Sequence, residues 1–133
     1  MRIVLDTNVL IAAFASRGLC AEVFEICVEN HSIILSDYIL AEVREKLDQK
    51  VRLPRPHIKE IISYLKAMAE IVEPAPLAAG VCRGSDDLNI IGTAVSGGAE
   101  LLVTGDGDLL ILKEFMGVNI VTPRGFWERL RAV

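Results

Sequence analysis

Acidic side chains in this sequence recur near the ends of short apolar runs, in four separate segments of the chain. In chain order these acids are Asp6, Glu42, the pair Asp86 and Asp87, and the pair Asp106 and Asp108. Carboxylates held close together repel one another unless protons or cations compensate their charge. Mg²⁺ and Mn²⁺ are suitable cations because they prefer oxygen ligands. A site of this kind suits the hydrolysis of a phosphate ester by metal-activated water.

Other residue types that carry chemistry are sparse. The histidines, His31 and His57, lie at predicted element starts away from these acids, and we expect no lysine to lie among the acids at the predicted sheet edge. The three cysteines form no C-x-x-C pair, which disfavours a zinc site and a disulfide framework. The stretch GDGDLL fits neither a dinucleotide-binding loop nor an EF-hand. Metal-assisted hydrolysis is therefore the chemistry that these residues best suit.

The composition predicts a single domain, residues 1–133, with an aliphatic core. The chain has 133 residues, of which 52% are hydrophobic and only 5% aromatic. A formal charge of −4 disfavours nucleic-acid binding over the whole surface but allows local basic patches. Asp6 and Asn8 interrupt the apolar N-terminal stretch, and no apolar run reaches the ~18 residues of a membrane span. We therefore expect a cytoplasmic protein that does not associate with membranes.

Alternating strands and helices predict where the acids lie. We predict strands at residues 3–5, 32–35, 101–104 and 119–121, and a weaker one at 71–73. We predict helices at residues 21–28, 37–50, 57–70 and 86–96, and a short last helix after Pro123. This alternation is typical of an α/β fold, a three-layer α/β/α sandwich around a mostly parallel sheet of four to five strands. Since sites form at the carboxyl ends of parallel strands, we expect the acids to meet at that edge.

Each acid also has a local explanation. Asp6 could cap a helix that starts near Asn8, and Glu42 could be a solvated side chain beside an apolar helix stripe. An acid is also favoured in the first turn of a helix or beside a glycine in a tight turn. These positions are held by Asp86, Asp87, Asp106 and Asp108. The recurrence of acids at one predicted edge favours a shared site over separate explanations.

Four stretches of the chain together resemble a PIN domain. They are VLDTNVLIAAF, LSDYILAEVREKL, GSDDLNIIGTAVSGGAELLVTGDGDLL and VNIVTPRGFWERL. The similarity is greatest to the prokaryotic PIN proteins that are described as toxin components of toxin–antitoxin pairs and are related to VapC. It covers essentially the whole chain in the expected order. It implies a Mg²⁺- or Mn²⁺-dependent ribonuclease on a three-layer α/β/α fold.

The resemblance also implies roles for individual residues. The four acids of the family match residues that would be catalytic and would hold the metal, and these are Asp6, Glu42, Asp87 and Asp106. Asp108 would be a further metal ligand, and Asn8, Thr104 and Asp86 would support the site. The chain departs from the group at Gly84-Ser85, where a proline is common, and at Leu88, where a lysine is common. Since no acid is missing, we expect an active enzyme.

Basic residues near the acids could hold the substrate. The residues that we expect to contact RNA phosphates are Arg44, Lys46, Lys50 and Arg52. Glu45 and Asp48 lie among them, so an ordinary solvated face is the alternative. The preference for RNA over DNA follows from the resemblance alone.

The resemblance further implies a cognate antitoxin and a homodimer. Five large side chains could lie in the core or could form such an interface, namely Tyr64, Met68, Phe115, Phe126 and Trp127. Two other functions stay open. One is a catalytically silent PIN-like module that binds RNA or protein, and the other is a phosphate-monoester hydrolase, against which the absence of a D-x-D motif counts.

Overall fold

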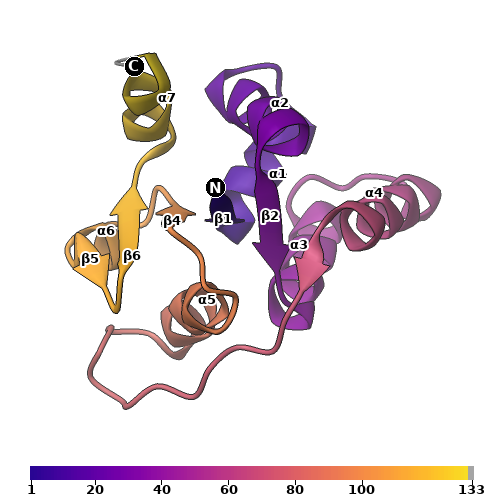
Figure 1. Cartoon of the computed structure of the whole chain (residues 1–133). Coiled ribbons are helices and arrows are strands. Elements are labelled where there is room, and N and C mark those ends of the chain that lie inside the picture. The colour runs from indigo at the N-terminus through magenta and orange to yellow at the C-terminus, as the bar shows by residue number, and fades with distance from the viewer. Residues whose placement is uncertain (132–133) are drawn as a thin grey trace.

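A six-stranded sheet forms the centre of the molecule. The computed structural model describes residues 1–131 (Figure 1). Its strands are β1 (Arg2–Leu5), β2 (Ser32–Leu35), β3 (Glu70–Ile71), β4 (Leu101–Val103), β5 (Glu114–Phe115) and β6 (Val118–Val121). Their order is β3-β2-β1-β4-β6-β5, and all pairs are parallel except β5 with β6. The predicted mostly parallel sheet is confirmed, with one strand more than expected.

Helices cover both faces of this sheet, as the three-layer prediction requires. They are α1 (Thr7–Ala15), α2 (Leu19–Asn30), α3 (Asp37–Gln49), α4 (Arg55–Met68), α5 (Ser85–Ser96), α6 (Gly107–Leu110) and α7 (Pro123–Arg131). Right-handed crossovers place α1 to α4 on one face and α5 and α6 on the other. Figure 1 shows α1 to α4 gathered on one side and α5 and α6 on the opposite side. Within residues 1–131, no helix combines the length and the apolar character that a membrane crossing needs.

Two short elements, α6 and β5, were not predicted from the sequence. They have four and two residues, which is too short for a hydrophobic period to be visible. Strand β5 pairs with β6 through a two-residue turn, and its residues Met116 and Gly117 have φ angles of 48° and 84°. Two positive φ angles suit the twist of an antiparallel hairpin. The formation of β5 therefore depends on turn geometry, which apolar patterning in the sequence does not reveal.

The core is aliphatic, as the composition predicted. The apolar residues of β1 are fully buried, because a central parallel strand is covered on both faces. Phe126 is fully buried on the packed side of α7. Tyr64, in contrast, is 45% exposed, and Met68, Phe115 and Trp127 are only partly buried. Of the five large side chains that could lie in the core or at an interface, only Phe126 is fully buried, while Met68 and Phe115 pack against the core from its edge.

The direction of the chain reverses between β1 and β4. From β1 the chain moves to β2 and then β3, and it returns through α5 to β4 on the other side of β1. Such a reversal opens a crevice at the carboxyl ends of the two strands, because their following segments move to opposite faces. Leu5 pairs with Val103, so Asp6 and Thr104 leave the sheet side by side. The backbone N–H of Asp6 donates to the carbonyl of Val103 at 3.0 Å.

A long loop joins β3 to α5 and passes close to α5 (Figure 1). The backbone N–H of Ala75 donates to the carbonyl of Gly92 at 2.9 Å. A Cβ atom on Gly92 would lie 2.6 Å from the carbonyl oxygen of Ala75. Glycine at this position therefore lets the loop backbone pack against the helix that carries Asp87.

Replacing this glycine should destabilise the fold. We expect Gly92→Ala to lower the free energy of unfolding by about 1–3 kcal/mol, because the new methyl group would displace loop backbone. Urea denaturation measures the change. Gly105→Ala is the matched control, since no atom lies within 4 Å of its added Cβ. Equal losses in the two variants would contradict the packing that we describe.

Candidate metal centre

Asp6 and Thr104 form the buried end of the site. Asp6 is only 6% exposed and occupies the N-cap position of α1, yet its side chain makes no capping hydrogen bond. Its Oδ2 instead accepts a hydrogen bond from Thr104 Oγ1 at 2.5 Å. A side-chain helix cap is therefore not the role of Asp6.

Burial raises the pKa of Asp6 above its ordinary value, and the nearby charge of Asp106 adds to this effect. The hydrogen bonds from Thr104 and from the backbone of Thr7 act in the opposite direction, as does the charge of Lys46. The carboxylate of Asp6 is therefore costly to keep ionised and depends on these partners.

The hydroxyl of Thr104 joins the first acid to the last. While Thr104 Oγ1 donates to Asp6, it accepts a hydrogen bond from the backbone N–H of Asp106 at 3.0 Å. Asp106 Oδ1 in turn accepts from the backbone N–H of Asp108 at 2.9 Å, at the start of α6. Asp106 therefore has the predicted turn role, and the turn also places its carboxylate in the crevice.

Three carboxylates from two segments meet above this pair. One carboxylate oxygen from each of Asp87, Asp106 and Asp108 lies within 4.8 Å of the other two. Burial, followed by the charge of Asp106, raises the pKa of Asp87 from 3.8 to about 6. Arg83 lies 3.8 Å from Asp108, but both side chains are too exposed for this pair to offset much of the repulsion.

The spacing of these oxygens suits a hard divalent cation. Mg²⁺ binds oxygen ligands at about 2.1 Å, so two ligands on opposite sides of the ion are about 4.2 Å apart. Oxygens that lie within 4.8 Å of one another need only small side-chain rotations to reach this spacing. The donor set therefore fits Mg²⁺ or Mn²⁺.

Glu42 and Asp86 form a neighbouring pair that a tyrosine joins. Thr7 Oγ1 donates to Glu42 Oε1 at 2.7 Å, and the Tyr38 hydroxyl lies 3.4 Å from Glu42 Oε2. The same hydroxyl donates to Asp86 Oδ1. Sequence reasoning missed Tyr38, although Tyr38 and Glu42 have the i, i+4 spacing that places them on one helix face.

Asn8 and Lys46 pair with each other beside the acids. Asn8 is exposed, and its Oδ1 accepts a hydrogen bond from Lys46 Nζ at 3.0 Å. The expectation that no lysine lies among the acids is wrong, because Lys46 lowers the pKa of Asp6 through its charge. Lys46 comes from α3, so its position depends on how α1 and α3 pack.

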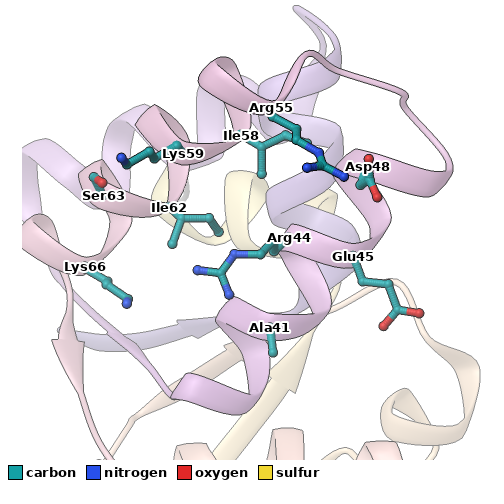
Figure 2. A pocket seen from close by; sticks show the side chains of 10 residues that line it. All are labelled: Ala41, Arg44, Glu45, Asp48, Arg55, Ile58, Lys59, Ile62, Ser63 and Lys66. Carbon is teal, nitrogen blue, oxygen red and sulfur yellow. The ribbon is translucent and has the colours of Figure 1, made fainter.

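The predicted basic rim divides into separate parts. Lys46 and Lys50 line a small pocket of about 210 Å³ together with Glu42 and Asp86. Arg44 belongs to a different groove of about 630 Å³ between α3 and α4. Figure 2 shows Arg44 pointing between these helices, where Lys59 and Lys66 also lie. Arg52 is exposed in the link between α3 and α4, with a φ angle of 59°.

A family model described as a PIN domain matches residues 2–108. The chain belongs to the PIN domain family. The matched range includes every acid of the predicted site, from Asp6 to Asp108. It ends at the start of α6, so β5, β6 and α7 lie beyond it. The resemblance that the sequence motifs indicated is confirmed at the level of the family.

Solved structures show the same fold at low sequence identity. PAE2754 from Pyrobaculum aerophilum has a TM-score of 0.67 and 20% identity, over 100% of this chain and 91% of the other. VapBC2 from Rickettsia felis, bound to a DNA fragment from its promoter, has a TM-score of 0.62 and 19% identity, over 92% of this chain and 98% of the other. FitAcB from Neisseria gonorrhoeae has a TM-score of 0.54 and 18% identity, over 92% of this chain and 98% of the other. No curated protein matches the chain.

The raised pKa of Asp87 predicts that the ionised carboxylate lowers the free energy of unfolding in metal-free buffer. Because the folded-state pKa is about 6 and the ordinary value is 3.8, stability falls as the pH rises through this window. Asp87→Asn removes this destabilisation, because asparagine carries no charge. We expect its Tm to equal that of the wild type near about pH 4 and to exceed it by about 1–4 °C near about pH 7.5.

Differential scanning fluorimetry in EDTA checks this difference. Asp48→Asn, which removes an exposed acid of the α3–α4 groove, is the control and should show no such rise. A lower Tm for Asp87→Asn near about pH 7.5 would show instead that the acid stabilises the first turn of α5.

Proposed function

We propose that the protein is a metal-dependent endoribonuclease that hydrolyses RNA phosphodiesters with Mg²⁺ or Mn²⁺. The observation that carries this proposal is the convergence of Asp87, Asp106 and Asp108 within 4.8 Å, beside a buried Asp6. Membership of the PIN domain family supports it. The acids come from three segments of the chain, and their repulsion is most simply explained by a cation that they bind.

The residues of the site have distinct roles in this proposal. Asp87, Asp106 and Asp108 would hold the ion directly, while Asp6 and Glu42 would bind it directly or accept hydrogen bonds from its water ligands. A bound divalent cation would favour ionisation of a neighbouring water and would offset negative charge on the phosphate oxygens. A water oxygen then bonds to phosphorus, one P–O ester bond breaks, and the departing oxygen takes up a proton.

Basic side chains beside the acids would position the strand. Lys46 and Lys50 share a pocket with Glu42 and Asp86, so they lie where a phosphate next to the cleaved bond could reach them. Arg44 and Arg52 are placed farther along α3 and its following link, and in this proposal they hold more distant phosphates. Such contacts fix the position of RNA but do not select its sequence.

The partners follow from the same proposal. We propose that this chain is the toxin of a toxin–antitoxin pair in the cytoplasm, that it forms a homodimer, and that a cognate antitoxin restrains it. The fold shared with VapBC2 supports a partner of this kind. The exposed Tyr64, beside Phe14 and Phe24 in a pocket of about 500 Å³, is a surface that such a partner could cover.

Cleavage of RNA in the presence of Mn²⁺ tests the proposed reaction. We expect Asp6→Asn and Asp106→Asn each to lower the cleavage rate by at least about 100-fold, and EDTA to abolish it. Asp48→Asn is the matched control and should retain full activity. A gel assay with labelled single-stranded RNA measures the rates.

Other outcomes identify the rival functions. Cleavage that survives both EDTA and Asp6→Asn would exclude the proposed site. Tight RNA binding without turnover at any metal concentration would favour the silent binding module. Faster turnover of small phosphate monoesters than of RNA would favour the monoester hydrolase.

Metal binding should also stabilise the protein by mass action. At an ion concentration of about 100 times Kd, binding contributes about 2.7 kcal/mol, which should raise Tm by about 5–10 °C. We expect Asp106→Asn to lose most of this rise and Asp48→Asn to keep it. A thermal shift that is the same in both variants would place the ion elsewhere.

A further inference from the structure

Another pocket, distinct from those described above, lies beside the carboxylate cluster. It has a volume of about 590 Å³ and shares Asp108 with the acid cluster. Its apolar walls are Val81 and Cys82 from the loop before α5, and Ile111 and Leu112 after α6. We call these four residues the apolar subsite. Burial raises the pKa of the Cys82 thiol, and the charges of Asp87, Asp106 and Asp108 add to this effect, so Cys82 lies near all three carboxylates. The subsite therefore adjoins the place where the scissile bond would lie.

Ile111 is unusual among the walls of this subsite. It is 77% exposed, although three other apolar residues line the same pocket. A large aliphatic side chain at this exposure contributes little to folding. In a pocket that is continuous with a charged site, it can instead contact an apolar part of a substrate.

Charge at the rim indicates what that substrate part is attached to. Arg83 also lines the pocket, and its side chain is 87% exposed, 3.8 Å from Asp108. A guanidinium in this position can leave the weak ion pair and bind a phosphate. The pocket thus offers a cation for a phosphate and an apolar wall next to it, which matches the alternation of phosphate and base along a nucleic-acid strand.

We infer that the apolar subsite receives the base next to the cleaved phosphate of a single-stranded RNA, with Ile111 packed against the base and Arg83 on an adjoining phosphate. This inference rests on the proposed function. Bases of single-stranded RNA can turn out of the stack into pockets, and isoleucine and leucine side chains insert between bases of duplex DNA in minor-groove complexes. A peptide would use the apolar walls but would have no need of the adjoining carboxylate site.

Part of the subsite lies outside the residues that the family model matches. The match ends at residue 108, whereas Ile111 and Leu112 follow it. In this inference, the subsite contributes to which base is preferred at the cut.

RNA binding and cross-linking test the subsite without requiring turnover. The probe is a random-sequence single-stranded RNA that contains 4-thiouridine, bound in Ca²⁺ buffer and followed by fluorescence anisotropy. We expect Ile111→Ser to weaken binding by about 5- to 30-fold, because the apolar contact with the base is lost, and to lose cross-links that the wild type forms at residues 81–83 or 111–112. Met116→Ser is the matched control, because Met116 is 69% exposed but does not line the pocket.

The outcomes separate this inference from the proposed reaction. Unchanged binding by Ile111→Ser, or cross-links only at other residues, would overturn the subsite even if the wild type cleaves RNA. Loss of binding in Ile111→Ser but not in Met116→Ser supports the subsite, even if the wild type never cleaves RNA and the proposed reaction fails. With an active enzyme, the base preference at the cut should weaken in Ile111→Ser alone.

Discussion

One buried hydroxyl group holds the two ends of this site together. Thr104 donates to Asp6 and accepts from the backbone of Asp106, so a single side chain links the segment after β1 to the segment after β4. The link is possible because β1 and β4 are parallel neighbours in register, with Leu5 opposite Val103. The chain reverses direction at this pair of strands, so the same place is also where an open α/β sheet forms its crevice.

Negative charge at the site is only partly compensated by its own residues. Burial raises the pKa of Asp6, and burial together with neighbouring acids raises that of Asp87, so both carboxylates would be more stable with a proton or a cation. Lys46 and Arg83 supply only partial compensation from the edge. Tyr38 holds Glu42 and Asp86 with a neutral hydroxyl and adds no positive charge. The remaining negative charge is what suits the site to a divalent ion.

Much of this arrangement could be predicted because strand ends are visible in the sequence. Asp6 and Asp106 follow apolar runs, and Asp87 lies in the first turn of a periodic helix. Contacts that depend on how helices pack could not be predicted, and the hydrogen bond between Lys46 and Asn8 is an example. Helix geometry alone could have separated Arg44 from Lys46, since residues two apart point to different faces, while Lys46 and Lys50 share one.

Anomalous diffraction from crystals soaked in Mn²⁺ tests the shared site most directly. We predict a manganese peak at coordinating distance from carboxylate oxygens of Asp87, Asp106 and Asp108. The peak should disappear in crystals of Asp106→Asn. A peak only at other acids, such as Glu45 and Asp48 in the α3–α4 groove, or no peak at saturating Mn²⁺, would contradict this prediction.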